Sequence, residues 1–484
     1  MTLETDSSPL ARAGRARVFA FYGAMITIAV IAFLLIRSAG DQLTAPSGAG
    51  LSQTAGRSIN STLFQALLAL AVIIGTARGI GWLFGLFGQP AVIGELVGGI
   101  MLGPSLLGQI APSLHDQLLP SGVTAFLGVY SQLGVILYLF LVGLELDLSV
   151  LRKSSHATLA ISHASIIAPF LLGAGLALSL YPRVSNSGVP FTVFSLFLGI
   201  SLSVTAFPVL ARILTDLKIS KSQMGVVALT CAAIDDVTAW CLLALVVSIA
   251  QERTADAVRT VLMTAALIVV VLEVVAPFVR RVVPRLDKSV DLSRAALSVV
   301  LLAMLASAMT TEYIGIHGFF GAFLFGAIIP HSSRLAVELK RRLDDFVAVL
   351  FLPVFFAYTG TRTEIGLITG VQDWLLCATI VTVACLGKFG GTLAASRLSG
   401  VGWRDSAALG ILMNTRGLVQ LIVLNVGLDL GVITPRLFTM LVVMALVTTL
   451  MATPILQLLL RRHPWVEMKP SLVGMNNAEV RDAI

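Results

Sequence analysis

The sequence has few charged residues and few cysteines for its length. Only 12% of its 484 residues are charged, whereas 57% are hydrophobic. This balance excludes a soluble globular domain and predicts an integral helical membrane protein. The four cysteines, Cys231, Cys241, Cys377 and Cys385, all lie in apolar runs. We therefore expect them to pack as small side chains and not to form a disulfide or metal set.

The sequence also lacks a basic cluster interleaved with exposed aromatic residues, so no nucleic acid is expected as a partner. Its net charge of +7 comes mostly from Lys and Arg in every second connection between apolar runs. This alternation is the positive-inside bias of membrane proteins and predicts cytoplasmic N- and C-termini. The basic connections carry Arg152 and Lys153, Lys218 and Lys221, Arg280, Arg281, Arg285 and Lys288, Arg334, Lys340, Arg341 and Arg342, and Arg397 and Arg404.

Apolar runs long enough to cross a bilayer predict about fourteen helices. The run at residues 18–36 has the basic flank of a signal peptide, but it is long enough to span. We interpret it as an extra N-terminal helix added to about 13 core helices. The core helices are expected after Pro90 and at residues 62–86, 123–146, 157–181, 190–214, 222–249, 256–283, 294–311, 314–330, 345–361, 371–396, 403–428 and 434–460.

These runs divide the chain into three expected parts. Residues 1–59 would hold a cytoplasmic tail, the extra transmembrane helix and a linker rich in Gly, Ser and Thr. Residues 60–460 would form one all-α polytopic transmembrane domain. Residues 461–484 would be a short cytoplasmic tail, with no room for a nucleotide-binding domain.

Two adjacent carboxylates, Asp235 and Asp236, lie near the middle of an apolar run at about residues 223–249. A charge at membrane depth is costly, so it should face a cavity, a partner or a pathway. Successive helix positions point about 100° apart, so one carboxylate can meet a substrate while the other meets a fixed countercharge. Lys388, also in mid-span, is the candidate countercharge. Two acids against one ammonium leave one negative charge, which indicates a cation or proton site, although a purely structural network is the alternative.

Two apolar runs carry signs of a broken helix. In the first, Pro208 pushes against the carbonyl of Val204 and frees it beside the hydroxyls of Ser203 and Thr205. Freed carbonyls at membrane depth must line a cavity or be buried in protein. In the second, Asn414, Thr415, Arg416 and Gly417 interrupt an apolar run. Taken singly, each could be an ordinary kink packed against its neighbours.

The two breaks occupy corresponding positions in two groups of three helices, residues 157–249 and 371–460. The connection count starts these groups on opposite sides of the membrane, so they would be inverted repeats. Paired broken helices in inverted repeats indicate the midplane site of a secondary transporter. This symmetry would bring the two carboxylates and Lys388 to one place.

These residues are those of a known family. The chain resembles the monovalent cation:proton antiporter-2 family, within the group that shares the sodium/proton antiporter fold. The resemblance runs over about residues 60–460. It rests on residues 89–95 (QPAVIGE), 102–105 (LGPS), 139–145 (LFLVGLE), 203–210 (SVTAFPVL), 234–236 (IDD), 387–388 (GK) and 414–418 (NTRGL).

The resemblance implies a homodimer whose protomers each have dimerisation helices and a core in which the two broken helices cross. It implies that Asp236 binds the ion or the proton and that Asp235 pairs with Lys388 in one state. Thr205, with Ser203 and Val204, would lie at the first crossing helix. Asn414, Thr415 and Arg416 would lie at the second, where Arg416 could neutralise helix C-terminal ends or pair with Glu95.

The expected function is therefore antiport, in which a monovalent cation and protons compete for one carboxylate site in the plasma membrane. Sodium and potassium both remain open as the cation, and no cofactor is expected. The alternative is a proton-coupled transporter of an organic solute on the same fold, since fold alone does not give the substrate. A cation channel is less favoured, because paired breaks with a midplane lysine fit alternating access better. An enzyme is not expected, because an intramembrane aspartyl protease needs its two acids on different helices.

Overall fold

The structure is a computed structural model that describes residues 53–145, 156–220, 222–250, 254–286 and 293–460, together with Thr27 and Ile31. The chain divides into two units, Met1–Ser61 and Thr62–Ile484. Apart from Thr27 and Ile31, which are helical, the expected extra helix at 18–36 lies outside the described residues. The expected tails lie outside them too. All that follows concerns the second unit.

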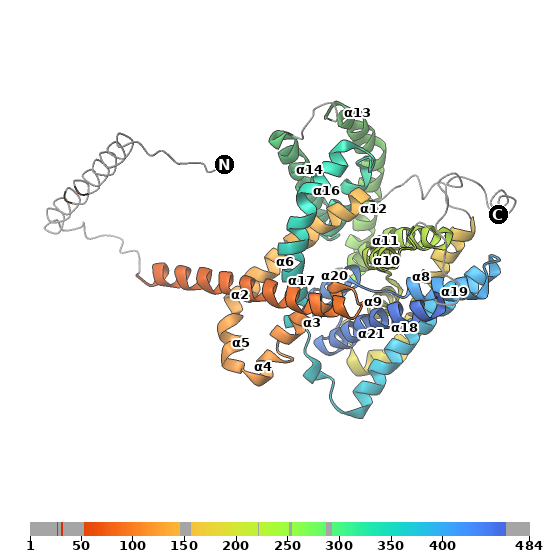
Figure 1. Ribbon diagram of the computed structural model, residues 1–484, viewed down its shortest axis with the longest axis horizontal. Coiled ribbons are helices and arrows are strands. Elements are labelled where there is room, and N and C mark those ends of the chain that lie inside the picture. Colours follow the sequence, from red (N-terminus) through yellow and green to blue (C-terminus); the bar gives the residue numbers. More distant parts are fainter. Residues whose placement is uncertain are drawn as a thin grey trace, which may run out of the picture. The chain divides into compact units, whose positions relative to one another are not determined.

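The elements of the described residues are helices, as the sequence predicts (Figure 1). The first half of the chain forms α2 (Gln53–Leu86), α3 (Ala91–Leu102), α4 (Leu107–Ile110), α5 (Pro112–Leu118), α6 (Ser121–Glu145), α8 (His156–Val184), α9 (Phe191–Ser203), α10 (Phe207–Asp216) and α11 (Gln223–Ala250).

The second half continues with two π-helical turns, η1 and η2, and one 3₁₀ turn, η3, among its α-helices. Its elements are α12 (Thr254–Val270), η1 (Val271–Val275), α13 (Ala276–Leu286), α14 (Arg294–Ile314), α15 (Gly318–Ile328), α16 (Arg334–Phe346), η2 (Val347–Phe351), α17 (Leu352–Thr361), η3 (Ile365–Leu367), α18 (Gly370–Leu398), α19 (Trp403–Met413), α20 (Leu418–Asp429) and α21 (Pro435–Leu460).

The number of spans agrees with the sequence. Eleven helices in the described part of the chain are long and apolar enough to cross a membrane. Helices α19 and α20 form a twelfth span whose halves bend by 43°, and α15 is a shorter apolar helix. Together these elements account for the 13 core helices expected between residues 62 and 460.

One basic stretch differs from its expectation as a connection. Residues 334–346 form the amphipathic helix α16. Its N-terminus is capped by the Ser333 hydroxyl, which accepts from the Ala336 N–H at 3.1 Å. Glu338 pairs with Arg341 at 2.7 Å and with Arg342 at 2.6 Å, the i,i+3 and i,i+4 positions of one helix face. These local pairs stabilise a helix that the apolar pattern alone does not reveal.

Small residues set how closely the helices approach near the centre of the second unit. A Cβ added at Gly387 of α18 would lie 2.6 Å from Pro169 Cα of α8, and one at Gly391 would lie 2.6 Å from Ala168 Cβ. Only glycine therefore fits on this face of α18. The two helices pack together, which places Lys388 directly beside α8.

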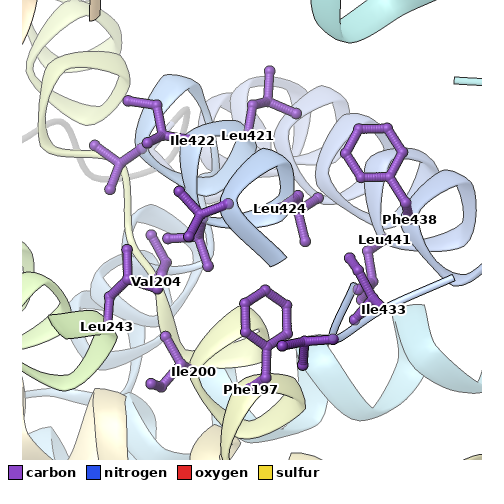
Figure 2. Packing of buried hydrophobic residues seen from close by; sticks show 14 of the residues in the cluster. Phe197, Ile200, Val204, Leu243, Leu421, Ile422, Leu424, Ile433, Phe438 and Leu441 are labelled. Carbon is purple, nitrogen blue, oxygen red and sulfur yellow. The ribbon is translucent and has the colours of Figure 1, made fainter. Parts of the chain in front are cut away.

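An apolar cluster packs α9, α11, α20 and α21 around the two breaks. Figure 2 shows Phe197 and Ile200 of α9 opposite Leu424 of α20 and Phe438 of α21. Each of these four side chains is at most 1% exposed. The half-helices on both sides of the breaks are thus held by packing, which keeps the interrupted backbone in register.

Candidate functional site

The first predicted break lies where the sequence placed it. Helix α9 ends at Ser203, the chain is extended through Val204 and Ala206, and α10 begins at Phe207. Pro208 occupies the first turn of α10, where its missing N–H costs no helical hydrogen bond. The proline therefore starts the second half-helix rather than kinking a continuous one.

The second break meets the first. Helix α19 ends at Met413 and α20 begins at Leu418. The Ala206 N–H donates to the Thr415 carbonyl across the two breaks at 3.1 Å. The Thr205 hydroxyl lies 3.2 Å from the Met413 carbonyl. The crossing of two broken helices is thus a direct backbone contact between them.

Arg416 closes the exposed end of α9. Its side chain is 1% exposed. The guanidinium donates to the carbonyls of Ser201 at 2.9 Å, Leu202 at 2.6 Å and Val204 at 3.3 Å. These are the last carbonyls of a helix, which have no helical partner and carry partial negative charge. Of the two roles expected for Arg416, neutralising a helix C-terminus is the one observed.

The other expectation for Arg416, a pair with Glu95, is wrong. Glu95 of α3 instead lies 3.5 Å from Arg78 of α2. The Arg78 guanidinium also donates to the Ala348 carbonyl at 3.0 Å. The preceding helix supplies the partner because α2 and α3 approach closely where Gly94 faces Gly81.

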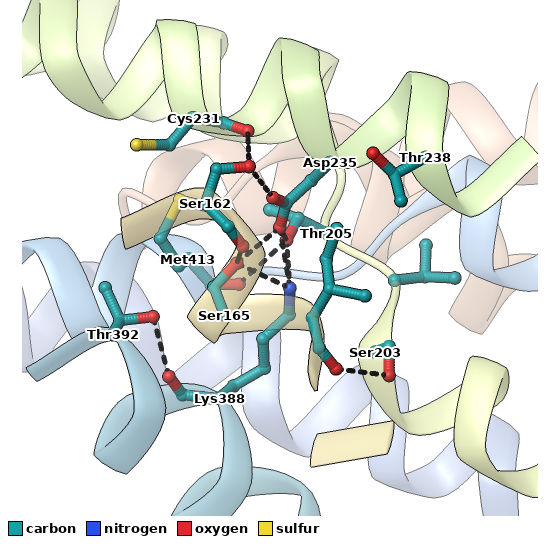
Figure 3. Close-up of polar contacts among 12 residues, drawn as sticks. Ser162, Ser165, Ser203, Thr205, Cys231, Asp235, Thr238, Lys388, Thr392 and Met413 are labelled. Atoms are coloured by element: carbon teal, nitrogen blue, oxygen red, sulfur yellow. Dashed lines mark hydrogen bonds and ion pairs between the residues drawn. The ribbon is translucent and has the colours of Figure 1, made fainter. Parts of the chain in front are cut away.

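Asp235 is fully buried and surrounded by donors (Figure 3). The Ser162 hydroxyl donates to its Oδ1 at 2.6 Å. The Ser165 and Thr205 hydroxyls each donate to its Oδ2 at 2.7 Å. An ionised carboxylate only accepts hydrogen bonds, so this shell of donors matches a negative charge.

Lys388 supplies the charge that balances Asp235, as predicted. Its ammonium lies 2.9 Å from Asp235 Oδ2, and both side chains are fully buried. The same nitrogen donates to the Thr205 hydroxyl at 2.5 Å and lies 3.5 Å from the Ser165 hydroxyl. Lysine, aspartate and hydroxyls therefore form one network that links α8, α11 and α18 to the first break.

Asp236 has the opposite surroundings, although it is the next residue. Its side chain is 3% exposed, yet neither carboxylate oxygen has a hydrogen-bond partner among the described residues. The Phe207 N–H, in the first turn of α10, lies toward it without ordinary hydrogen-bond geometry. A helix N-terminus favours negative charge nearby. A cation or a proton could therefore occupy the unmet acceptor positions of Asp236.

The other predicted site residues contact helix backbone rather than the carboxylates. The Ser203 hydroxyl donates to the carbonyls of Gly199 at 2.7 Å and Ile166 at 3.0 Å. The Thr415 hydroxyl donates to the Leu412 carbonyl at 2.8 Å. The Asn414 amide nitrogen lies 3.4 Å from Cys385 Sγ. Of the hydroxyls expected at the breaks, only that of Thr205 reaches the acid pair.

Sequence reasoning missed Ser162 and Ser165, which lie one turn apart on α8. Their i,i+3 spacing puts both hydroxyls on one face of the helix. That spacing was the available signal, but a serine in an apolar helix more often bonds its own backbone. It also left Arg416 out of the charge count. The described site holds two acids and two buried cations, so the surplus negative charge inferred from Asp235, Asp236 and Lys388 alone is not present.

Comparison with known proteins agrees with this geometry. Residues 68–462 match the family described as "Sodium/hydrogen exchanger, transmembrane". The Na(+)/H(+) antiporter NhaS4 of Synechocystis sp. is 43% identical over 397 residues, which cover 82% of this chain and 97% of that protein.

Two eukaryotic relatives match less of their own length. Cation/H(+) antiporter 18 of Arabidopsis thaliana is 38% identical over 82% of this chain and 49% of that protein. K(+)/H(+) antiporter 1 of Saccharomyces cerevisiae is 36% identical over 82% of this chain and 46% of that protein. The chain thus spans about half the length of these two relatives.

The fold is also that of a solved antiporter. The sodium proton antiporter MjNhaP1 of Methanocaldococcus jannaschii matches with a TM-score of 0.58 and 15% identity, over 83% of this chain and 97% of that one. At this identity the likeness concerns the fold alone. The sequence matches are closer, and from them the chain belongs to the sodium/hydrogen exchanger family of multi-pass membrane proteins.

Proposed function

We propose that this chain exchanges a monovalent cation, sodium or potassium, for protons by alternating access, with Asp236 as the binding carboxylate. The observation that carries the proposal is the buried, unpartnered carboxylate of Asp236 on α11. A buried anion without a partner is unfavourable, and either a proton or a cation can neutralise it. Both cannot occupy it together, so they compete, and that competition is sufficient for exchange.

The neighbouring groups have different roles in this proposal. Asp235 and Lys388 form the fixed pair, and the Thr205 hydroxyl, which contacts both, links that pair to the first break. Val204 offers its carbonyl to Arg416. Ser203, Asn414 and Thr415 shape the breaks without binding the ion, because their contacts are made with neighbouring helices.

The relatives support a cation as the substrate rather than an organic solute. Their names give sodium, potassium and unspecified cations as the ions exchanged for protons. The site is also small and closed by protein on all described sides, since Asp235 and Lys388 are fully buried. An organic solute would need a larger apolar pocket around the charged groups.

The wider arrangement is part of the same proposal. Residues 60–460 would act as one antiporter domain with repeats at 157–249 and 371–460, in a homodimer in the plasma membrane. Both termini would be cytoplasmic, which is supported by the alternation of basic connections along the chain. Alternating access would be a movement of the core helices against the dimerisation helices.

The test is exchange in proteoliposomes that hold a trapped pH dye and carry an imposed proton gradient. Sodium, potassium, lithium and rubidium are added separately to wild-type protein and to Asp236→Asn. We expect cation-dependent proton efflux from the wild type, and its rank order gives the selectivity. Wild-type protein that is folded but inert to all four cations would overturn the proposal.

A further inference from the structure

We infer that Ser162 and Ser165 of α8 are positioning residues for exchange. Their hydroxyls keep Asp235 ionised, so that Lys388 can leave it when a cation arrives. This inference rests on the proposed function. It concerns a step that the acid pair alone does not explain, namely how a fully buried ion pair can open during transport.

The difficulty lies in the carboxylate that remains behind. Removing one partner of a buried ion pair leaves an uncompensated charge, which is more costly than never having formed the pair. Lys388 is the only ammonium within salt-bridge distance of Asp235 among the described residues. Without other donors, the pair would be locked and the lysine could not respond to a cation.

The two serines supply those donors from a different helix. Ser162 and Ser165 bind opposite oxygens of Asp235 from α8, at 2.6 and 2.7 Å, whereas Lys388 reaches it from α18. With Thr205 they make three hydroxyl donors that stay in place when the ammonium moves. Hydrogen bonds to an ionised group are about twice as strong as neutral ones.

The hydroxyl geometry favours the carboxylate over the available alternatives. Each of the three hydroxyls has one proton and a second possible acceptor, a backbone carbonyl. Ser162 lies 3.3 Å from the Cys231 carbonyl, Ser165 lies 2.8 Å from the Ser162 carbonyl, and Thr205 lies 3.2 Å from the Met413 carbonyl. In every case the Asp235 oxygen is closer. The hydroxyl protons are therefore expected to point at Asp235.

The experiment measures the cation concentration for half-maximal exchange and the maximal rate separately, with sodium and with potassium. Ser162→Ala/Ser165→Ala should raise the half-maximal concentration about 10-fold, with the maximal rate within about 2-fold. The reason is that cation binding must now include the cost of an unsupported Asp235. Ser165→Cys, which has nearly the same size but a weaker donor, should fall between wild type and Ser165→Ala.

The matched control is Ser396→Ala on α18. Ser396 is also fully buried, and its hydroxyl has no hydrogen-bond partner among the described residues. The same change of side chain should leave both kinetic constants unchanged there. An equal shift in Ser396→Ala would mean that any buried Ser→Ala change perturbs exchange, and it would overturn the inference.

A second background separates positioning from packing. In Lys388→Ala there is no ammonium to release, so adding the two serine changes should move the half-maximal concentration by less than about 2-fold. A full 10-fold shift in that background, or an unshifted wild-type background, overturns the inference. If the double variant does not fold, the single Ser165→Cys and Ser165→Ala variants decide by the same criteria. Inert wild-type protein would instead defeat the proposed function.

Discussion

Asp235 and Asp236 are adjacent in the chain, yet α11 presents them to two different environments. Asp235 accepts from three hydroxyls and an ammonium, whereas Asp236 has no hydrogen-bond partner in the described part of the chain. Both are almost completely buried. The difference therefore does not come from exposure to solvent. It comes from which helices face each side of α11, and it assigns a fixed role to one acid and an exchangeable ligand to the other.

The largest expected effect follows from replacing each acid in turn. Asp236→Asn should abolish cation-dependent exchange while the protein stays folded, because the amide cannot hold the transported charge. Asp235→Asn should keep cation-dependent exchange at a reduced rate, because its neighbours and not the substrate use that carboxylate. Initial rates of the trapped pH dye measure both. Active Asp236→Asn protein, or equal loss in the two variants, would remove the distinction between the acids.

The cations facing these acids can be compared next. Arg416→Gln removes the charged donors from the last carbonyls of α9, and a lysine cannot reach all three carbonyls that the guanidinium contacts. We expect Arg416→Gln to destabilise the protein by about 3 kcal/mol or more, and Arg416→Lys to recover only part of this. Thermal unfolding in detergent measures the loss. Full recovery by lysine would show that charge, and not the fork of donors, is what α9 requires.

Lys388→Ala should act more on stability than on ion binding. It leaves Asp235 ionised with three hydroxyl donors, so the expected loss is below the 3–5 kcal/mol typical of a broken buried pair. The midpoint of thermal unfolding should fall, and Asp235→Asn/Lys388→Ala should recover part of it because no buried charge is left unpaired. An unchanged midpoint in Lys388→Ala would contradict the structural role of the pair.

The smallest expected effect concerns an ion pair outside the site. Arg362 lies 2.5 Å from Asp429 at the end of α20, and the two side chains are 20% and 39% exposed. Exposed pairs typically contribute less than about 1 kcal/mol. Arg362→Gln should therefore lower the unfolding midpoint much less than Lys388→Ala does. A loss as large as that of Lys388→Ala would mean that burial is not what distinguishes the two pairs.

Sequence reasoning could predict the elements that have few alternatives. A lysine and two acids in mid-span have hardly any other charged group to meet, so the Asp235–Lys388 pair was predictable. The breaks were predictable because Pro208 and the polar residues 414–417 interrupt apolar runs. These signals are local to the chain, and the structure places them as expected.

The remaining features depend on contacts between distant segments. Ser162 and Ser165 are ordinary serines until α8 faces Asp235, which lies 73 and 70 positions further along the chain. Glu95 could have met any arginine, and only the approach of α2 and α3 selects Arg78. Helix α16 was hidden because its stability comes from a cap and ion pairs rather than from an apolar run.

Arg416 also has an electrical consequence. With Asp235, Asp236, Lys388 and Arg416 all ionised, the empty site carries no net charge, and a bound cation or a bound proton each adds one positive charge. A membrane potential of 100 mV acts on each moved charge with about 2.3 kcal/mol. Voltage would then act equally on both loaded forms, and one-for-one exchange would be insensitive to it. If Lys388 loses its proton when the cation binds, the cation-loaded form becomes neutral, and voltage drives only the proton-carrying half of the cycle.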